Sequence, residues 1–326
     1  MFYPKFLKEN NTIGICAPSA GVGYKLEDFQ KSVDKLMERG FKIVETESVR
    51  NLGDVSAAGE VRAAELISLF ENENIDVVFC ASGGDFLMEM LPFVDIEKIG
   101  ENPKWFMGYS DPTSLLYWIT THLDMATFYG FNAGSFDMDN WHESLETAHD
   151  FWKGNWHKQE SFSMWQKEKS KGEFVLDTPV EWETLTAVKE ARGRVIGGCI
   201  DVLRDLLGTK RDCTREFWER YPEDKFIWYF DVFSLTADDF YRALFQMKEA
   251  GWFERVAGVV VGRVLFEGGF TEMTYKQALK NIFGEEVLLV FNADIGHTAP
   301  HMMMVNGAVA EVNSADKKGS IEFFQE

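Results

Sequence analysis

The sequence predicts an α/β protein with a doubly wound, mainly parallel N-terminal domain and a smaller α+β C-terminal domain. Short apolar runs alternate with stretches whose apolar residues recur at helical spacing, which is typical of a parallel sheet covered by helices. The run at 75–81 is apolar almost throughout, as expected for a strand buried on both faces. The length of 326 residues favours two domains over one.

The elements of the N-terminal domain follow from these runs. Its strands should end at turn-forming residues and are expected at 12–17, 41–44, 75–81, 105–109 and 125–129. Helices with apolar residues three and four positions apart are expected at 26–39, at 60–71, from Pro112 onward and at 141–152. Trp105 and Trp118 are expected in the core.

A polar segment of mixed charge at 153–173 is the expected linker. It divides the chain into domains 1–165 and 166–326. The second domain is expected to contain strands at 191–200, 226–230, 257–262, 287–291, 308–312 and 321–324, with helices at 201–207 and 235–250. Its last two strands are short and alternating, which favours an α+β domain.

Composition disfavours several classes of function. Lys and Arg total 33 against 53 Asp and Glu, and a net charge of −20 disfavours nucleic acid and anionic membrane as partners. No apolar run approaches the ~20 residues of a membrane helix, and the N-terminus does not resemble a secretory signal, so we expect a cytoplasmic protein. The four cysteines form no C-x-x-C pair and are expected to be reduced structural thiols.

Neither a metal nor a cofactor is expected. The histidines at 142, 149 and 157 lack the spacing and the acidic third residue of a metal site. The glycines after the first strand do not meet the G-x-G-x-x-G pattern of dinucleotide-binding loops.

Ser110 is the first candidate site residue, because it lies where a buried strand should turn into a helix. Pro112 suits the first turn of that helix, and Ser110 or Asp111 is the expected N-cap. A serine at such a turn also has the placement of a nucleophile, with main-chain N–H groups of the helix near a developing oxyanion. Taken alone, the pattern favours capping over a nucleophile.

Two distant segments complete a constellation for acyl transfer. Asp231 follows an apolar strand, and His297 lies in a Gly-His-Thr segment after another. A serine, an imidazole and a carboxylate are the set that nucleophilic acyl transfer needs. Asp231 could instead cap a turn, as Asp238 or Asp239 could cap the next helix. His297 could be a structural histidine, with His301 as the weaker candidate base.

Together these segments resemble the LD-carboxypeptidase (muramoyltetrapeptide carboxypeptidase) family, whose microcin C immunity branch shares the fold. The similarity runs nearly end to end. It lies in 13–19, in 75–84 with its Gly-Gly turn, in 103–111, in Gly197-Gly198 with 207–209, and in 296–298.

The resemblance implies a flavodoxin-like N-terminal domain and a set of site residues. Ser110 would be the nucleophile and His297 the base. The main-chain N–H groups of Gly84 and Asp111 would form the oxyanion hole, and Gly83 and Asp85 would contact substrate.

The sequence also departs from the family's pattern at three places. Asp231 stands where the family carries glutamate, and its shorter side chain should need a backbone shift or a water to reach the histidine. Cys199 stands where asparagine is common. Asp85-Phe86 replaces an aromatic residue and a glycine.

The expected function is therefore that of a serine carboxypeptidase that hydrolyses an L,D-peptide bond in murein-derived peptides. One alternative is a microcin C immunity-like hydrolase of aminoacyl or peptidyl nucleotide conjugates, in which an aromatic residue such as Trp182 could stack on a base. Another is a non-catalytic binding protein of the same fold. We expect a small peptide or peptide conjugate as substrate and a cytoplasmic homodimer.

Overall fold

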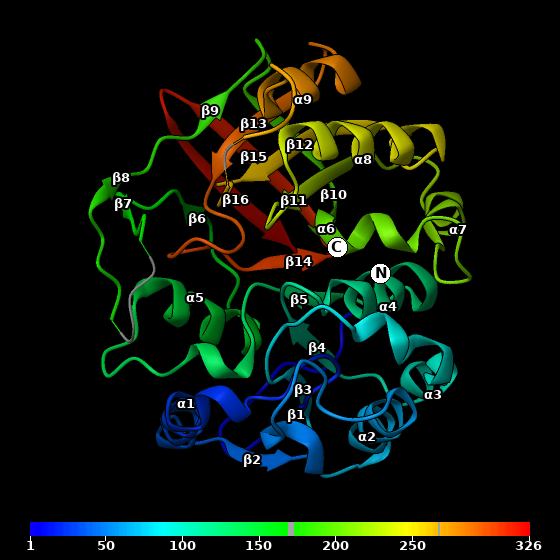
Figure 1. Cartoon of the computed structure of the whole chain (residues 1–326), viewed down its shortest axis with the longest axis vertical. Coiled ribbons are helices and arrows are strands. Elements are labelled where there is room, and N and C mark those ends of the chain that lie inside the picture. The colour runs from blue at the N-terminus through cyan, green and yellow to red at the C-terminus, as the bar shows by residue number, and fades with distance from the viewer. Residues whose placement is uncertain (169–172, 267) are drawn as a thin grey trace. The chain divides into compact units, whose positions relative to one another are not determined.

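The computed structural model describes residues 1–168, 173–266 and 268–326 (Figure 1). They fall into two units of comparable length. The first holds 1–155 with Glu173, and the second holds the described residues of 156–168 and 174–326. No described helix is long and apolar enough to cross a lipid bilayer.

A parallel sheet forms the centre of the first unit. Its strands, in spatial order, are β5 (Thr127–Tyr129), β4 (Trp105–Gly108), β3 (Val77–Cys80), β1 (Thr12–Cys16) and β2 (Lys42–Glu45). All four neighbouring pairs run parallel. The order 2-1-3-4-5 is that of flavodoxin-like folds, and it confirms the predicted doubly wound sheet. Strands β3 and β4 are buried at every residue because helices cover both faces.

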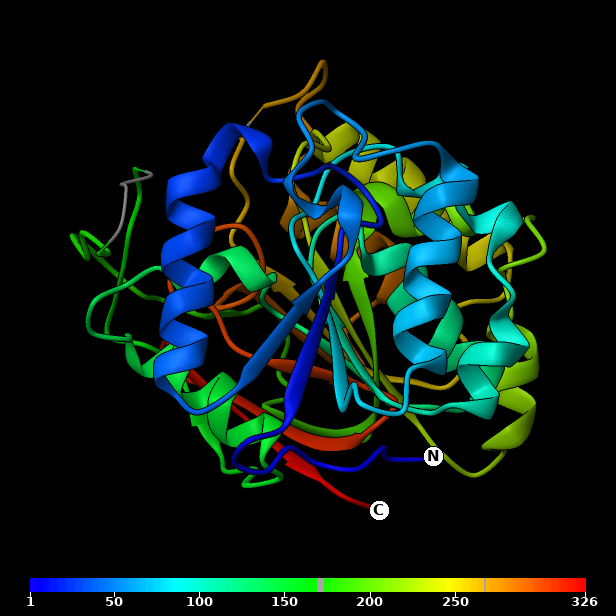
Figure 2. The ribbon, with the colours of Figure 1, turned by 90° about the horizontal axis from the view of Figure 1, so that it is seen from below.

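The helices of this unit lie on both sides of the sheet. They are α1 (Leu26–Glu38), α2 (Gly59–Glu71), α3 (Ile96–Glu101), α4 (Thr113–Leu123) and α5 (Glu143–Trp152). Short 3₁₀ turns occur at Gly23–Lys25, Glu47–Arg50, Leu87–Glu89, Leu91–Phe93 and Ala133–Ser135. Figure 2 shows α1 on one side of the strands and α2 on the other. Trp105 and Trp118 are both in the core, as predicted.

The second unit is built on a mixed sheet. Its strands, in spatial order, are β6 (Gln159–Glu160), β16 (Lys318–Phe324), β15 (Val309–Ala315), β10 (Glu190–Cys199), β11 (Phe226–Asp231), β12 (Val256–Gly262), β13 (Leu288–Ala293) and β9 (Glu183–Thr184). The pairs from β10 to β13 are parallel, and the outer pairs are antiparallel. Consequently Cys199, Asp231 and the residues after β13 all lie at the edge of the sheet formed by the carboxyl ends of these parallel strands.

Helices and short strands complete this unit. The α-helices are α6 (Ile200–Leu203), α7 (Thr214–Arg220), α8 (Ala237–Glu249) and α9 (Tyr275–Phe283). A 3₁₀ turn at Arg204–Leu206 follows α6 directly. Strands β7 (Met164–Trp165) and β8 (Thr178–Pro179) pair with each other, and β14 spans Met304–Asn306.

The four cysteines are buried thiols, as predicted, and none of them forms a disulfide within the described residues. Cys16 and Cys80 face each other in register on β1 and β3 of the first unit. Cys199 ends β10 and Cys213 precedes α7 in the second.

Candidate active site

Ser110 lies at the junction of β4 and α4, where the sequence places it. Its φ is +70°, in the left-handed region that few residues other than glycine occupy. The Thr113 N–H donates to the Ser110 carbonyl at 2.9 Å, which closes the turn. A serine held in this conformation between a parallel strand and a helix has the backbone geometry of a nucleophile elbow.

The predicted capping role of this turn is wrong. Pro112 occupies the N-cap position of α4, and no side chain caps the helix there. The Asp111 side chain is 2% exposed and points inward instead. Its carboxylate accepts hydrogen bonds from the Ser19 hydroxyl and from the Leu87 N–H, the latter at 2.9 Å. Asp111 thus ties the serine turn to the ends of two other segments of the unit.

The Gly83-Gly84 turn lies directly against Ser110. A Cβ added to Gly83 would lie 3.2 Å from the Ser110 Oγ, and one added to Gly84, whose φ is +155°, would collide with the Ser19 hydroxyl. Within the described residues, no hydrogen bond uses the main-chain N–H of Gly84 or Asp111 as donor. Two main-chain donors close to the serine are the requirement for an oxyanion hole. Asp85, the next residue, is exposed.

Two polar residues that the sequence analysis missed support this turn. Asn132 accepts a hydrogen bond from the Tyr109 N–H at 3.1 Å, and the Tyr129 hydroxyl accepts one from the Ser110 N–H at 3.4 Å. Both lie at or just after β5, the strand next to β4. A polar residue after a neighbouring parallel strand was a usable signal, because such strand ends meet at one edge of the sheet.

We expect Asp111→Asn to change how stability depends on pH. Burial raises the pKa of the Asp111 carboxyl, so the folded protein holds this proton more tightly than the unfolded chain does. The stability contributed by this proton is present at low pH and is lost as the pH rises through the folded pKa. Asparagine can accept the same two hydrogen bonds without a charge. The free energy of unfolding should therefore fall less for the variant than for the parent between about pH 4 and pH 7.

Chemical denaturation across this pH range checks the expectation. Asp54→Asn, at an exposed position, is the control. If the difference between Asp111→Asn and its parent stays constant with pH, burial of the Asp111 charge does not destabilise the fold.

Asp231 and His297 lie together in the second unit. Asp231 ends β11 and is fully buried, while the His297 side chain is 11% exposed. The His297 Nδ1 lies 3.0 Å from Oδ1 and 2.8 Å from Oδ2 of Asp231. A carboxylate at Nδ1 holds the proton on that nitrogen and leaves Nε2 as the nitrogen that can act as a base.

Gly296 brings the main chain close to the Asp231 carboxylate. Its φ is +94°, and a Cβ on it would collide with the Asp231 carboxylate. The main chain therefore passes directly over the carboxylate and delivers the next residue, His297, into contact with it. The direct contact at Nδ1 shows that the aspartate needs no bridging water to reach the histidine.

Gly296→Ala is expected to lower turnover on the order of 10²-fold, because the methyl group must push the His297 segment away from Asp231 by about an ångström. Gly251→Ala is the matched control. Gly251 also has a positive φ, +81°, but its Cβ would meet only the end of the Glu254 side chain at 3.5 Å. Steady-state rates for both variants, with their melting temperatures, make the comparison. Equal losses in the two would show that backbone strain alone is responsible.

A buried ion pair supports the segment that carries His297. Arg263 pairs with Asp294 and donates to the Thr298 hydroxyl and the Pro300 carbonyl, each at 2.7 Å. Asp294 also accepts the Trp182 indole N–H at 2.8 Å. Burial raises the pKa of Asp294 and lowers that of Arg263, while their mutual attraction opposes both shifts.

The same contacts correct the suggested role of Trp182. Its side chain is 1% exposed, and its ring fills the space above Gly319. An indole packed in this way belongs to the core and offers no face for stacking on a base.

The competing candidates have structural roles. Asp238 accepts hydrogen bonds from the Phe270 N–H at 2.6 Å and from Thr271. Thr236, rather than either aspartate, caps α8, and Asp239 pairs with Arg242 at 2.8 Å. His301 is buried, but His297 is the histidine whose ring contacts Asp231.

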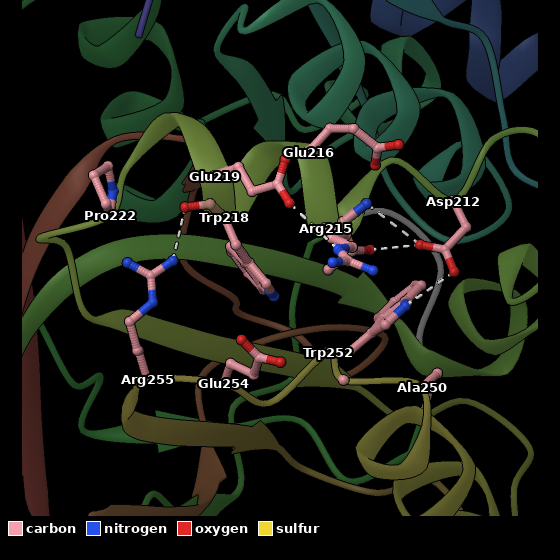
Figure 3. Close-up of a pocket in the computed structure, with 12 residues that line it drawn as sticks. Asp212, Arg215, Glu216, Trp218, Glu219, Pro222, Ala250, Trp252, Glu254 and Arg255 are labelled. Carbon is pink, nitrogen blue, oxygen red and sulfur yellow. Dashed lines mark hydrogen bonds and ion pairs between the residues drawn. The ribbon is translucent and has the colours of Figure 1, made fainter.

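A separate depression of about 730 Å³ lies between α7 and the turn at 250–255 (Figure 3). Trp252, which donates to Asp212 at 3.1 Å, and Arg255, which donates to the Trp218 carbonyl at 2.8 Å, are part of its wall. No predicted site residue lines it. In the described part of the chain, no group of three or more His, Cys, Asp or Glu is arranged to hold a metal ion.

Comparison with known proteins identifies the family. Residues 13–130 match the LD-carboxypeptidase N-terminal domain, and residues 192–312 match the LD-carboxypeptidase C-terminal domain. The chain belongs to the LD-carboxypeptidase family. This confirms the family resemblance of the sequence motifs and shows a hydrolase of the peptidase class.

Relatives of this LD-carboxypeptidase family member cover nearly all of it. A protein named "Probable murein peptide carboxypeptidase", from Bacillus subtilis, is 26% identical over 98% of this chain and 94% of its own length. The microcin C7 self-immunity protein MccF from Escherichia coli is 25% identical over 97% of this chain and 94% of its own length. The crystal structure of an MccF-like protein from Bacillus anthracis has a TM-score of 0.85 at 23% identity and covers 100% of both chains, which shows the shared fold.

Proposed function

We propose that the protein is a serine carboxypeptidase in which Ser110 is the nucleophile, His297 the general base and Asp231 the residue that orients the histidine. The Asp231–His297 contact carries the proposal, since a buried carboxylate on Nδ1 prepares Nε2 for proton transfer. The left-handed turn at Ser110 supports it. The proposal requires the Ser110 Oγ and the His297 Nε2 to come within hydrogen-bond reach in the working enzyme.

The reaction follows from these roles. The Ser110 Oγ attacks the scissile carbonyl carbon as its proton passes to His297, and the N–H groups of Gly84 and Asp111 stabilise the oxyanion. Collapse of the tetrahedral intermediate breaks the C–N bond, and His297 gives its proton to the leaving amine. Water then attacks the acyl-enzyme with His297 again as base, which releases the carboxylic acid product and restores Ser110.

We propose an L,D-peptide bond in a murein-derived peptide as the bond that is cleaved. Family membership and the name of the Bacillus subtilis relative support this substrate. Incubation with a murein tetrapeptide should yield the tripeptide and a free D-amino acid in equal amounts, detected by mass spectrometry. A tetrapeptide that stays intact under conditions where another substrate is hydrolysed would contradict the assignment.

A nucleotide conjugate is the second candidate substrate. MccF has been solved in complex with glutamyl sulfamoyl guanosine and with aspartyl sulfamoyl adenosine, and these structures have TM-scores of 0.80 and 0.81 to this chain. Trp182 cannot supply the stacking surface here, because it is buried. Direct competition between the tetrapeptide and an aminoacyl sulfamoyl adenosine separates the two, since the preferred substrate is consumed first. A cytoplasmic homodimer stays a prediction, which cell fractionation and sedimentation would test.

A further inference from the structure

We propose that Asp201 is a positioning residue for the Asp231–His297 pair, because its carboxylate fixes the turn that follows Asp231. The inference rests on the proposed function, since it assigns a role within the same site. Asp201 lies outside the sequence motifs that define the site.

The contacts of Asp201 fall on consecutive residues of one turn. Its carboxylate accepts the N–H of Phe233 at 2.9 Å, of Ser234 at 2.7 Å and of Leu235 at 3.1 Å, and the Ser234 hydroxyl at 2.7 Å. These residues lie between the end of β11 and the start of α8. Three consecutive main-chain N–H groups directed at one carboxylate define the path of the turn.

We call the hydrogen bonds that Asp201 accepts from residues 233–235 the Asp201 clamp. Strand register places this clamp next to Asp231. Cys199 and Asp231 are partners in register at the ends of β10 and β11, and Asp201 follows Cys199 by two residues. The Cys199 Sγ lies 3.6 Å from the Asp201 Oδ2. Burial and the negative charges of Asp231 and Asp201 raise the pKa of the Cys199 thiol. The clamp therefore acts next to the point where the Asp231 main chain leaves the sheet.

The turn held by Asp201 reaches the histidine through Phe233. The centroid of the Phe233 ring lies 4.5 Å from that of His297, with the ring planes tilted by 39°. Phe233 is 38% exposed, and its ring also lies edge-on to that of Phe266, with the ring centroids 6.2 Å apart. Asp201 thus acts on the imidazole from two sides: through the main chain of Asp231 and through the ring of Phe233.

The closing experiment compares Asp201→Ala, Asp201→Asn and Asp205→Ala in the full chain, with the substrate that the parent hydrolyses. Asp205 is the matched control, one helical turn further on and exposed. Asp201→Ala should lower kcat on the order of 10²-fold with little change in KM, because the pair is displaced while substrate contacts remain. In Asp201→Asn the amide oxygen can keep the Ser234 and Leu235 hydrogen bonds, so most of kcat should return.

A spectroscopic measurement tests the proposal without turnover. An aromatic ring at this distance is expected to shift the NMR signals of the His297 ring. Asp201→Ala should therefore move those signals, as Phe233→Leu should, whereas Asp205→Ala should not. His297→Gln assigns the resonance. If Asp201→Ala folds poorly, the smaller displacement in Asp201→Asn is measured in the same way. Unchanged kcat and unchanged His297 signals in the Asp201 variants would overturn the proposal. A parent activity that survives Ser110→Ala would overturn the proposed function instead.

Discussion

Replacing Ser110 by alanine is expected to remove nearly all turnover, on the order of 10⁴-fold or more, and His297→Ala should do the same. Each change removes one end of a single proton transfer, so the remaining partner has nothing to act on. The double variant should consequently be scarcely slower than either single variant. Single-turnover rates with the cleaved substrate make this measurement, and multiplying losses would show that the two residues act separately.

Neighbouring residues of the same types provide the controls. Ser114 is buried in the first turns of α4, and His301 lies four residues after His297. Ser114→Ala and His301→Ala should keep turnover within about tenfold of the parent after correction for folding. A loss in His301→Ala as large as that in His297→Ala would contradict the choice of base. Persistent turnover in Ser110→Ala would favour a different nucleophile, whereas a parent protein that binds the substrate without cleaving it would favour a binding protein.

The second large effect is expected on stability. Arg263→Met should destabilise the second unit by about 3–5 kcal/mol, because it leaves the Asp294 carboxylate buried without its countercharge. The Thr298 and Pro300 partners are lost as well. Burial already raises the Asp294 pKa, and loss of Arg263 should raise it further. Protonation of Asp294 then favours the folded state of the variant. The loss in the free energy of unfolding should therefore shrink as the pH falls, and it should grow as the pH rises through the pKa of Asp294 in the folded variant.

Equilibrium unfolding in denaturant, at acidic and at neutral pH, measures this deficit. Arg192→Met is the control, since Arg192 pairs with Glu311 on the surface with its side chain 44% exposed, and such pairs contribute about 1 kcal/mol or less. The double variant Arg263→Met with Asp294→Asn removes both charges and should recover part of the loss. Equal effects of Arg263→Met and Arg192→Met would show that the buried pair adds nothing beyond a surface one.

The parts of the fold that could be predicted are those set by local pattern. Short stretches of sequence are enough to predict the apolar runs that become β3 and β4 and the helical spacing after Ser110. The strand-to-helix turn at Ser110 follows from these two patterns. The contact of His297 with a residue 66 positions earlier could be expected only through the family resemblance, because periodicity carries no information on distant contacts.

The rest depends on side chains brought together by the tertiary fold. Asp111 is a good capping residue by local preference, but hydrogen bonds from Ser19 and Leu87, 92 and 24 positions away, draw its carboxylate inward. The Arg263–Asp294 pair and the Asp201 clamp likewise join residues more than 30 positions apart. Trp182 looked available for stacking because a sequence does not show which face of an indole is covered.

The distribution of the buried cysteines offers a chemical way to watch the two units independently. Cys16 and Cys80 report on the first unit, and Cys199 and Cys213 on the second. Only the thiolate reacts with alkylating reagents, and burial raises the pKa of Cys80 and Cys199 well above the usual range and that of Cys213 to about 11. Labelling of each pair therefore reports transient opening of its own unit. A variant such as Arg263→Met can thus be assigned to the unit that it loosens, by locating the alkylated peptides after digestion.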